Sequence, residues 1–401
     1  MSHHRLGLLS VFILFVSAFM GDGPLASDQL QRIEPNKLTG TSSAVVVDGG
    51  SLIHTVQFLP LSVDRLSKST SAVEQLSNVL EQLQAAIGDS SLSSIARLNL
   101  YVTSDNVAEE VRRVLPSHFP GEHQPTVSLV VTGLPMPGAV VALDAVACGP
   151  GRDLGHVRQE QRFAVLPSGS RIYVSGQAEQ SDSLAEATGN TLRSLHNTLD
   201  FLGRSDEDIV QLKVFVQPMS DAEVVREQVR KFFKDKSVPP LVMVEWKSSR
   251  TTPVEIELIA WGGPANEGLP AMEFLTPPGM TTPAVYCRVC RINDPRSIYV
   301  SGLSASQEHS APVGSGADAD QEVKEIFASL NRILTLAGSD FEHLGKATYY
   351  VSTEAASISL NKLRPDYYNP ARPPAASKAM VESVGVPGLE LTLDMIAVPG
   401  D

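Results

Sequence analysis

The side chains most able to bind a metal or carry redox chemistry are three cysteines and nine histidines. Cys287 and Cys290 have CxxC spacing, but they lie in the strand-like run 284–292, where residues i and i+3 point to opposite faces. His118 and His123 flank a Pro-Gly turn without an acidic or cysteine partner. No HxH, HExxH, GxGxxG or Walker sequence occurs in the chain. The sequence therefore predicts no metal site and no bound cofactor.

The charge of the chain limits its partners. The formal net charge is −13, and no run of Lys and Arg is interleaved with aromatic residues. Proteins that bind nucleic acid usually carry a basic patch, so we expect no nucleic-acid partner. A content of 42% hydrophobic and 19% charged residues is typical of globular domains.

The first 26 residues have the composition of an export signal. A short basic stretch, 1–5, precedes an apolar run, 6–20, that is short for a membrane span. A Val-Ser-Ala triplet at 16–18 has the small residues of a cleavage site. We therefore expect an exported protein, periplasmic or secreted, with a linker at 27–43. The alternative is an uncleaved segment that holds the chain at a membrane.

One five-residue sequence occurs twice in the chain. Ile-Tyr-Val-Ser-Gly stands at 172–176 and again at 298–302. Its β-branched and aromatic residues predict a strand, and the glycine lets the chain turn or lets another group approach closely. The segment 52–57 is interpreted as a divergent first copy, in which Gln57 is matched with Gln177.

Further landmarks recur in the same order around each copy. Apolar residues at spacings of three and four predict a helix that ends at Gly88, Gly203 or Gly338. A strand, a second helix and a last strand are then expected at 98–102, 105–119 and 141–147; at 212–216, 221–233 and 254–260; and at 347–351, 354–368 and 391–397. We predict an α+β chain of three tandem modules, each a mixed β-sheet packed by two helices. The predicted modules are 44–148, 156–263 and 278–401, with a linker at 264–277.

This order of landmarks resembles the RidA superfamily, also called YjgF or L-PSP endoribonuclease-like, whose modules have a chorismate mutase-like fold. Members are typically homotrimers with ligand sites between subunits. The resemblance implies that the three linked modules form an intramolecular pseudo-trimer, and that the chain is a monomer. The activity it implies is hydrolysis of reactive enamines and imines to 2-keto acids and ammonia. This chemistry needs an arginine for the substrate carboxylate and a glutamate that acts on water.

The first two modules lose most of the implied residues. Val127 and Leu241 stand where the family has its arginine, and Ala142 replaces the glutamate of the first module. Glu255 keeps the glutamate position in the second module and is a candidate catalytic residue. The alternative interpretation is that Glu255 and Glu257 form an exposed strand face.

The third module keeps more of the pattern. Lys378 stands at the arginine position and is the other candidate catalytic residue, although lysine attracts a carboxylate only as a point charge. The alternatives are a solvated lysine at a strand edge and a Schiff-base lysine. Thr392 replaces the glutamate of this module. The other candidates, all for substrate binding, are Tyr286, Ser301, Gly302, Asn361 and Glu382, with Ser175 and Gly176 of the second module.

Three of these candidates also have simpler interpretations, and so does the whole protein. Tyr286 could be a packed aromatic residue, and the hydroxyls of Ser175 and Ser301 could close turns. The favoured function is an enamine or imine deaminase that binds a small carboxylate near the third module. Because the family arginine is missing from all three modules, a catalytically inactive ligand-binding protein or scaffold is the alternative.

Overall fold

The structure is a computed structural model that describes residues 29–61, 71–88, 92–149, 155–234, 236–306 and 317–400. The predicted signal segment, 1–26, lies outside the described residues. Among these residues, no helix combines the length and the apolar character that a membrane crossing requires.

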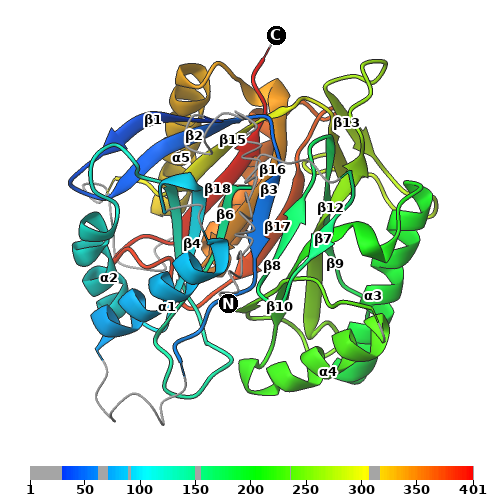
Figure 1. Ribbon diagram of the computed structural model, residues 1–401, viewed down its shortest axis with the longest axis horizontal. Helices are drawn as coiled ribbons and strands as arrows, with labels where there is room; N and C mark the ends of the chain where they lie inside the picture. The colour runs from blue at the N-terminus through cyan, green and yellow to red at the C-terminus, as the bar shows by residue number, and fades with distance from the viewer. Residues whose placement is uncertain are drawn as a thin grey trace, which may run out of the picture.

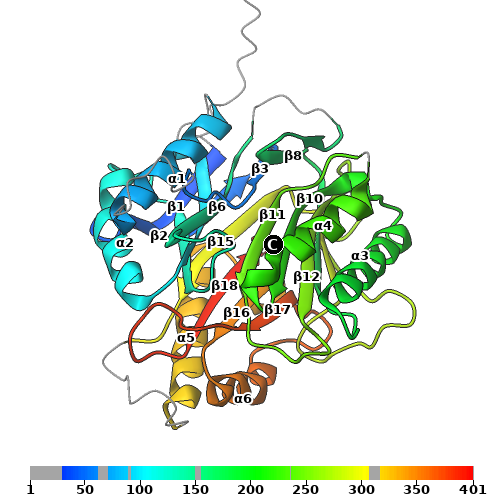
Figure 2. The same cartoon turned by 90° about the horizontal axis from the view of Figure 1, so that it is seen from below.

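Three six-stranded mixed sheets form the interior, and two helices cover each of them on the outside (Figures 1 and 2). The first module contributes β3 (Leu52–Thr55), α1 (Ala72–Ile87), β4 (Ile95–Val102), α2 (Asp105–His118), β5 (Thr126–Val131) and β6 (Val141–Cys148). The second contributes β9 (Ser170–Gln177), α3 (Leu184–Phe201), β10 (Ile209–Val216), α4 (Ala222–Phe233), β11 (Leu241–Glu245) and β12 (Val254–Gly263). The third contributes β15 (Arg296–Leu303), α5 (Ala317–Leu336), β16 (Leu344–Val351), α6 (Glu354–Leu363), β17 (Ala375–Met380) and β18 (Leu391–Ala397). The predicted α+β fold of three modules is confirmed.

The helices begin and end where the sequence supplies the right groups. Ser71 forms a capping box with Glu74 at the start of α1, and Thr353 caps α6 by accepting from Ala356 N–H. The three glycines predicted to end the first helices have positive φ angles, which a residue with a side chain rarely adopts. These angles are 64° at Gly88, 65° at Gly203 and 72° at Gly338.

The last two strands of each sheet come from the segment that precedes another module. The hairpin β1–β2 (Leu30–Asn36 and Thr41–Asp48) joins β15 of the third module. The pair β7–β8 (Arg158–Gln159 and Phe163–Leu166) joins β3 of the first module, and β13–β14 (Met272–Leu275 and Val289–Ile292) joins β9 of the second. This exchange of strand pairs is cyclic, because the pair that precedes each module completes the sheet of a neighbouring module.

Two segments predicted to be linkers therefore belong to sheets. The segment 27–43 contains β1 and the start of β2, and the segment 264–277 contains β13. The outer strands β1 and β13 bury few apolar side chains; Ile33 and Met272 are the buried ones. Edge strands of this kind lack the alternation that reveals a half-buried strand, which explains the error.

The modules pack around a common centre. Besides one apolar core between each sheet and its helices, two further clusters join the modules to one another. One of these contains Tyr101, Phe215 and Tyr350, which occupy the same position on β4, β10 and β16. Equivalent faces of the three sheets therefore meet, as a pseudo-trimer requires.

Candidate functional site

A cleft of about 250 Å³ lies between the second and third modules. Gly176 and Glu255 of the second module line it, together with Tyr286, Asn361 and Lys378 of the third. The structure thus brings five of the predicted site residues into one place. We call it the polar cleft.

Glu255 lies on β12, half-buried at the wall of the polar cleft. Burial, together with the charge of Glu257 two residues along the strand, raises the pKa of Glu255 to about 7. The positive charge of Lys346 is the largest effect in the opposite direction. Gly176 faces the same carboxylate, and a methyl group at that position would overlap Glu255. Glycine at this position therefore leaves room for the Glu255 side chain.

Lys378 reaches the cleft from β17. Its Nζ atom donates to Ser357 Oγ at 2.8 Å and to Asn361 Oδ1 at 3.2 Å, both on α6. Burial and the nearby charge of Arg364 lower the pKa of Lys378 from its ordinary value. An ammonium group has three N–H donors, so one remains for a ligand.

Arg364 also lines the polar cleft, and the sequence reasoning missed it. It follows α6 in a short 3₁₀ turn (Arg364–Asp366) and is buried, with its guanidinium 5.0 Å from the centre of the Tyr349 ring. Its Nη2 atom lies 3.4 Å from Asn361 Oδ1. The spacing from Asn361 was the available signal, because residues three apart share one face of a helix.

Two cations therefore share one neutral acceptor. Among the described residues neither Lys378 nor Arg364 forms an ion pair, and Arg364 Nε has no hydrogen-bond partner. Arg364 is buried and Lys378 is half-buried, and a buried cation without an ion-pair partner is costly. The arrangement is that of an anion-binding site, with the Glu255 carboxyl group on the opposite module.

The family model for Endoribonuclease L-PSP matches residues 161–261 and 280–399, which is more than half of the chain. The chain belongs to this family. The two matched ranges contain every residue that lines the polar cleft.

Solved structures similar to single modules include members of the YjgF family. A YjgF-family protein of Neisseria meningitidis is 19% identical, covering 32% of this chain and 96% of its own, with a TM-score of 0.23. Rv2704 of Mycobacterium tuberculosis is 17% identical (25% and 78% covered, TM-score 0.22). E. coli TdcF, solved with bound serine, is 22% identical (23% and 81% covered, TM-score 0.22). No curated protein matches the chain.

The serines of the two Ile-Tyr-Val-Ser-Gly sequences connect neighbouring modules. Ser175 Oγ donates to Cys287 O at 2.6 Å and accepts from Ala376 N at 2.7 Å. Ser301 Oγ donates to Ser42 O at 2.7 Å and accepts from Val127 N at 2.9 Å. The hydroxyls are thus used within the protein, and Ser175 is buried outside the lining of the polar cleft.

Three other predicted residues lie away from the polar cleft. Ser301 and Gly302 line a second cleft, between the third and first modules. Glu382 is exposed and lies 3.3 Å from Lys247 Nζ, in a surface ion pair. The structure does not bring these residues to Lys378.

Strand register corrects the alignment of the three modules. Lys378 pairs with Tyr349, and the positions level with it on β5 and β11 are Leu129 and Met243. The predicted counterparts Val127 and Leu241 lie two residues earlier, on the same side of the strand. The first two modules still lack the family arginine after this shift, because neither leucine nor methionine can pair with a carboxylate.

The interface between the first and second modules is closed by a side chain. In strand register, His54 of β3 corresponds to Tyr173 of β9, so Gln57 occupies the position of Gly176. The predicted match of Gln57 with Gln177 was therefore wrong. The Gln57 side chain donates to Met243 O at 2.9 Å and accepts from Met243 N at 3.2 Å. Gln57 thus fills the place where the other interfaces are open.

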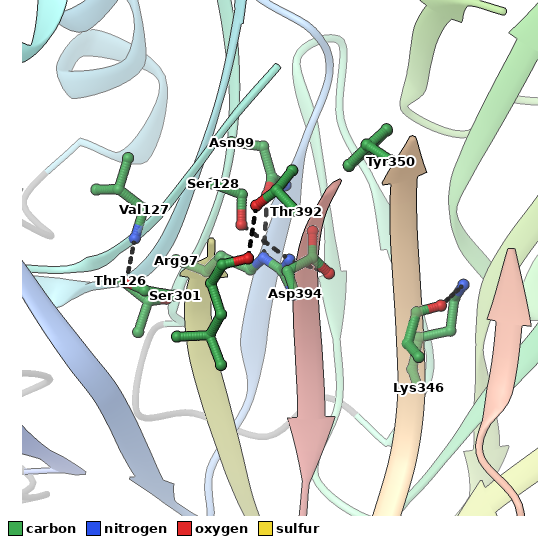
Figure 3. A network of polar contacts seen from close by, with 12 residues as sticks. Arg97, Asn99, Thr126, Val127, Ser128, Ser301, Lys346, Tyr350, Thr392 and Asp394 are labelled. Carbon is green, nitrogen blue, oxygen red and sulfur yellow. Dashed lines mark hydrogen bonds and ion pairs between the residues drawn. The ribbon is translucent and has the colours of Figure 1, made fainter. Parts of the chain in front are cut away.

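Behind each interface lies a buried polar pair at equivalent positions. Arg97 contacts Asp394 (Figure 3), Lys346 Nζ lies 2.6 Å from Glu257 Oε2, and Gln211 Nε2 lies 3.4 Å from Asp144 Oδ2. Although burial acts in the other direction, Arg97 and Lys213 lower the pKa of the Asp394 carboxyl group. Each pair joins two modules, so the charges help to fix how the modules are arranged.

Within the described ranges, no three His, Cys, Asp or Glu side chains converge as metal ligands would. The groups available for chemistry in the polar cleft are thus one carboxyl group with a raised pKa and two cations.

Proposed function

We propose that the polar cleft binds a small carboxylate with an enamine or imine group and hydrolyses it to a keto acid and ammonia. The observation that carries the proposal is the pair of cations without an anionic partner, Lys378 and Arg364, facing Glu255 across a cleft of about 250 Å³. Membership of the L-PSP family supports it.

The cations would hold the substrate carboxylate. Lys378 offers its free N–H, and Arg364 offers a planar guanidinium group, which suits a carboxylate better than an ammonium does. Asn361 accepts from both and so keeps them side by side. Arg364 would supply, from the end of α6, the guanidinium that β17 lacks at Lys378.

Glu255 would move the protons. With a pKa of about 7, it exists in both protonation states near neutral pH, which suits an acid/base catalyst. As a base it takes a proton from water while the oxygen bonds to the imine carbon. As an acid it returns that proton to the nitrogen of the resulting carbinolamine. The Glu255 carboxylate then carries the remaining O–H proton to the same nitrogen, so that the C–N bond breaks, the carbonyl forms and ammonia leaves.

The test is an assay of ammonia release from imino acids. These short-lived compounds are generated in situ by an amino-acid oxidase with catalase present, and the protein is added to the mixture. We expect ammonia release to be faster than in buffer, and to be slowed strongly by Glu255→Gln. Glu382→Gln is the matched control, because it makes the same chemical change at an exposed site outside the cleft.

Each other outcome has a definite meaning. If the unmutated protein does not accelerate release, the deaminase proposal is wrong. A small 2-keto acid that binds in calorimetry without turnover, and loses affinity in Lys378→Met, would instead support the ligand-binding alternative. Equal rates for the unmutated protein and Glu255→Gln would remove Glu255 from the mechanism.

A further inference from the structure

The second cleft, between the third and first modules, has a volume of about 310 Å³. Strands β15 and β18 contribute Ser301, Gly302 and Thr392, and the first module contributes Leu115 and Leu129 from α2 and β5. These are the same elements, at the next interface, that build the polar cleft. We call it the apolar cleft.

At the positions that carry charged side chains in the polar cleft, the apolar cleft has uncharged ones. Leu129 corresponds to Lys378, because the two pair with equivalent positions of β4 and β16. Thr392 corresponds to Glu255, because the two pair with equivalent positions of β16 and β10. Helices α2 and α6 both begin directly after a capping hydroxyl, at Ser104 and Thr353. Counting from these caps, Leu115 of α2 corresponds to Arg364.

The polar atoms that remain in the apolar cleft already have partners within the protein. Thr392 Oγ1 donates to Leu303 O at 3.0 Å, and the Ser301 hydroxyl has both partners described above. Thr39 and Thr41 pair with each other at 2.8 Å. Arg112 is exposed, and its guanidinium donates to Gly385 O. A ligand inside the cleft therefore meets mainly side-chain carbon.

We propose that the apolar cleft binds a small uncharged apolar molecule of about the size of two fused aromatic rings. A cavity of about 150 Å³ lined by aliphatic residues is enough to hold benzene, and this cleft is about 310 Å³. An anionic ligand would have to leave its water shell for walls whose cation, Arg112, already donates to Gly385 O, which is costly. The proposal is independent of the deaminase proposal, since it concerns different residues and a different ligand.

Isothermal titration calorimetry with two compounds tests it. 2-Naphthol is uncharged at neutral pH, and 2-naphthoate presents the same rings with a carboxylate. We expect saturable binding of 2-naphthol, and at least about tenfold weaker binding of 2-naphthoate. Tighter binding of 2-naphthoate, or no saturable binding of 2-naphthol, would overturn the proposal.

Two substitutions locate the site. Val127→Phe fills the cleft from a half-buried wall position without adding charge, and should weaken 2-naphthol binding by about tenfold or more. Leu129→Lys introduces the lysine of the polar cleft, and should reverse the preference in favour of 2-naphthoate. Leu336→Lys, on an exposed leucine at the end of α5, is the control and should leave both affinities unchanged. Unchanged 2-naphthol binding in a folded Val127→Phe protein would exclude this cleft.

A measurement on the unmutated protein covers the case in which these variants fail to fold. Hydrogen exchange with saturating 2-naphthol should slow in α2 and β5, whose residues line the apolar cleft. Slowing in α6 and β17 instead would assign the ligand to the polar cleft and contradict the proposal.

Discussion

The polar and apolar clefts are built from equivalent elements of one chain and differ almost entirely in their side chains. The polar cleft presents Glu255, Lys378 and Arg364, whereas the apolar cleft has Thr392, Leu129 and Leu115 at these positions. The backbone features that shape the opening, including the glycines Gly176 and Gly302, are kept in both. The shape of an interface therefore does not depend on the charges within it.

The interface between the first and second modules differs from both open clefts. There Gln57 replaces the glycine, and its amide bonds to the backbone of Met243 close the opening. In a symmetric homotrimer a single substitution changes all three sites at once. Linked modules instead let one cleft keep its charges while a second becomes apolar and a third closes.

The largest expected effect separates the two open clefts by chemistry. Glu255→Gln should lower kcat/KM for imino acid hydrolysis by about 10²–10⁴-fold, because it removes the acid/base group. In the ammonia-release assay, Glu382→Gln should stay within about twofold, since exposed ion pairs contribute little. A comparable loss in both variants would mean that the effect is not specific to the polar cleft.

The next effect concerns the buried pairs behind the clefts. Arg97→Met leaves Asp394 buried and unpaired, so the free energy of unfolding should fall by about 3–5 kcal/mol in urea titrations. Gln211→Met changes the equivalent neutral position, where the cost should be about 1 kcal/mol. Similar costs in the two variants would show that the charge at this position has little importance.

Removal of one cation tests how the substrate carboxylate is held. Lys378→Met should raise KM for imino acids by about 10–100-fold, which corresponds to the loss of a hydrogen bond to a charged group. The control Lys362→Met removes an exposed lysine of α6 that pairs with Asp320 at 2.6 Å, and KM should not change. If KM is unaltered in Lys378→Met, Arg364 is sufficient alone.

The closed interface makes a prediction about stability. Gln57→Ala should lower the free energy of unfolding by about 1–3 kcal/mol, because two buried backbone groups of Met243 lose their partners. Gln321→Ala, on the exposed surface of α5, should change it by less than about 0.5 kcal/mol. No difference between these variants in urea titrations would show that the amide bonds of Gln57 do not hold the interface.

The last effect is a dependence of stability on pH. The folded pKa of Glu255 is about 7, above the ordinary value of 4.5, so the folded protein binds more protons than the unfolded chain between these values. The contribution of this carboxyl group to stability is therefore lost as pH rises through that window. Thermal melts should show Glu255→Gln gaining stability relative to the unmutated protein from pH 5 to pH 8, whereas Glu382→Gln should not.

The sequence was enough to predict the modules and part of the polar cleft, because these depend on local patterns. Apolar spacing and terminal glycines identify the helices, and Glu255, Asn361 and Lys378 stand at positions that a family resemblance can locate. Gln57 could not be placed, since strand register depends on the pairing of β3 with β6 and not on nearby residues.

The exchange of hairpins was not predictable for a related reason. β8 is followed directly by β9, which in sequence looks like a hairpin, yet it pairs with β3. Nothing in the residues of β8 distinguishes the edge of β3 from the equivalent edge of β9. The choice depends on how three modules close around one centre, which no single segment encodes.

The cyclic exchange of hairpins also affects how the chain can be synthesised and folded. Val46 of β2 pairs with Ile298 of β15, so a strand made near the beginning of translation must wait for the last module before it has its partner. Until then its edge is unpaired and able to associate with another nascent chain. The first module, in contrast, can complete its sheet as soon as β8 leaves the ribosome. Folding should thus proceed by early closure of the first sheet and late closure of the third, with the slow step set by the longest separation along the chain.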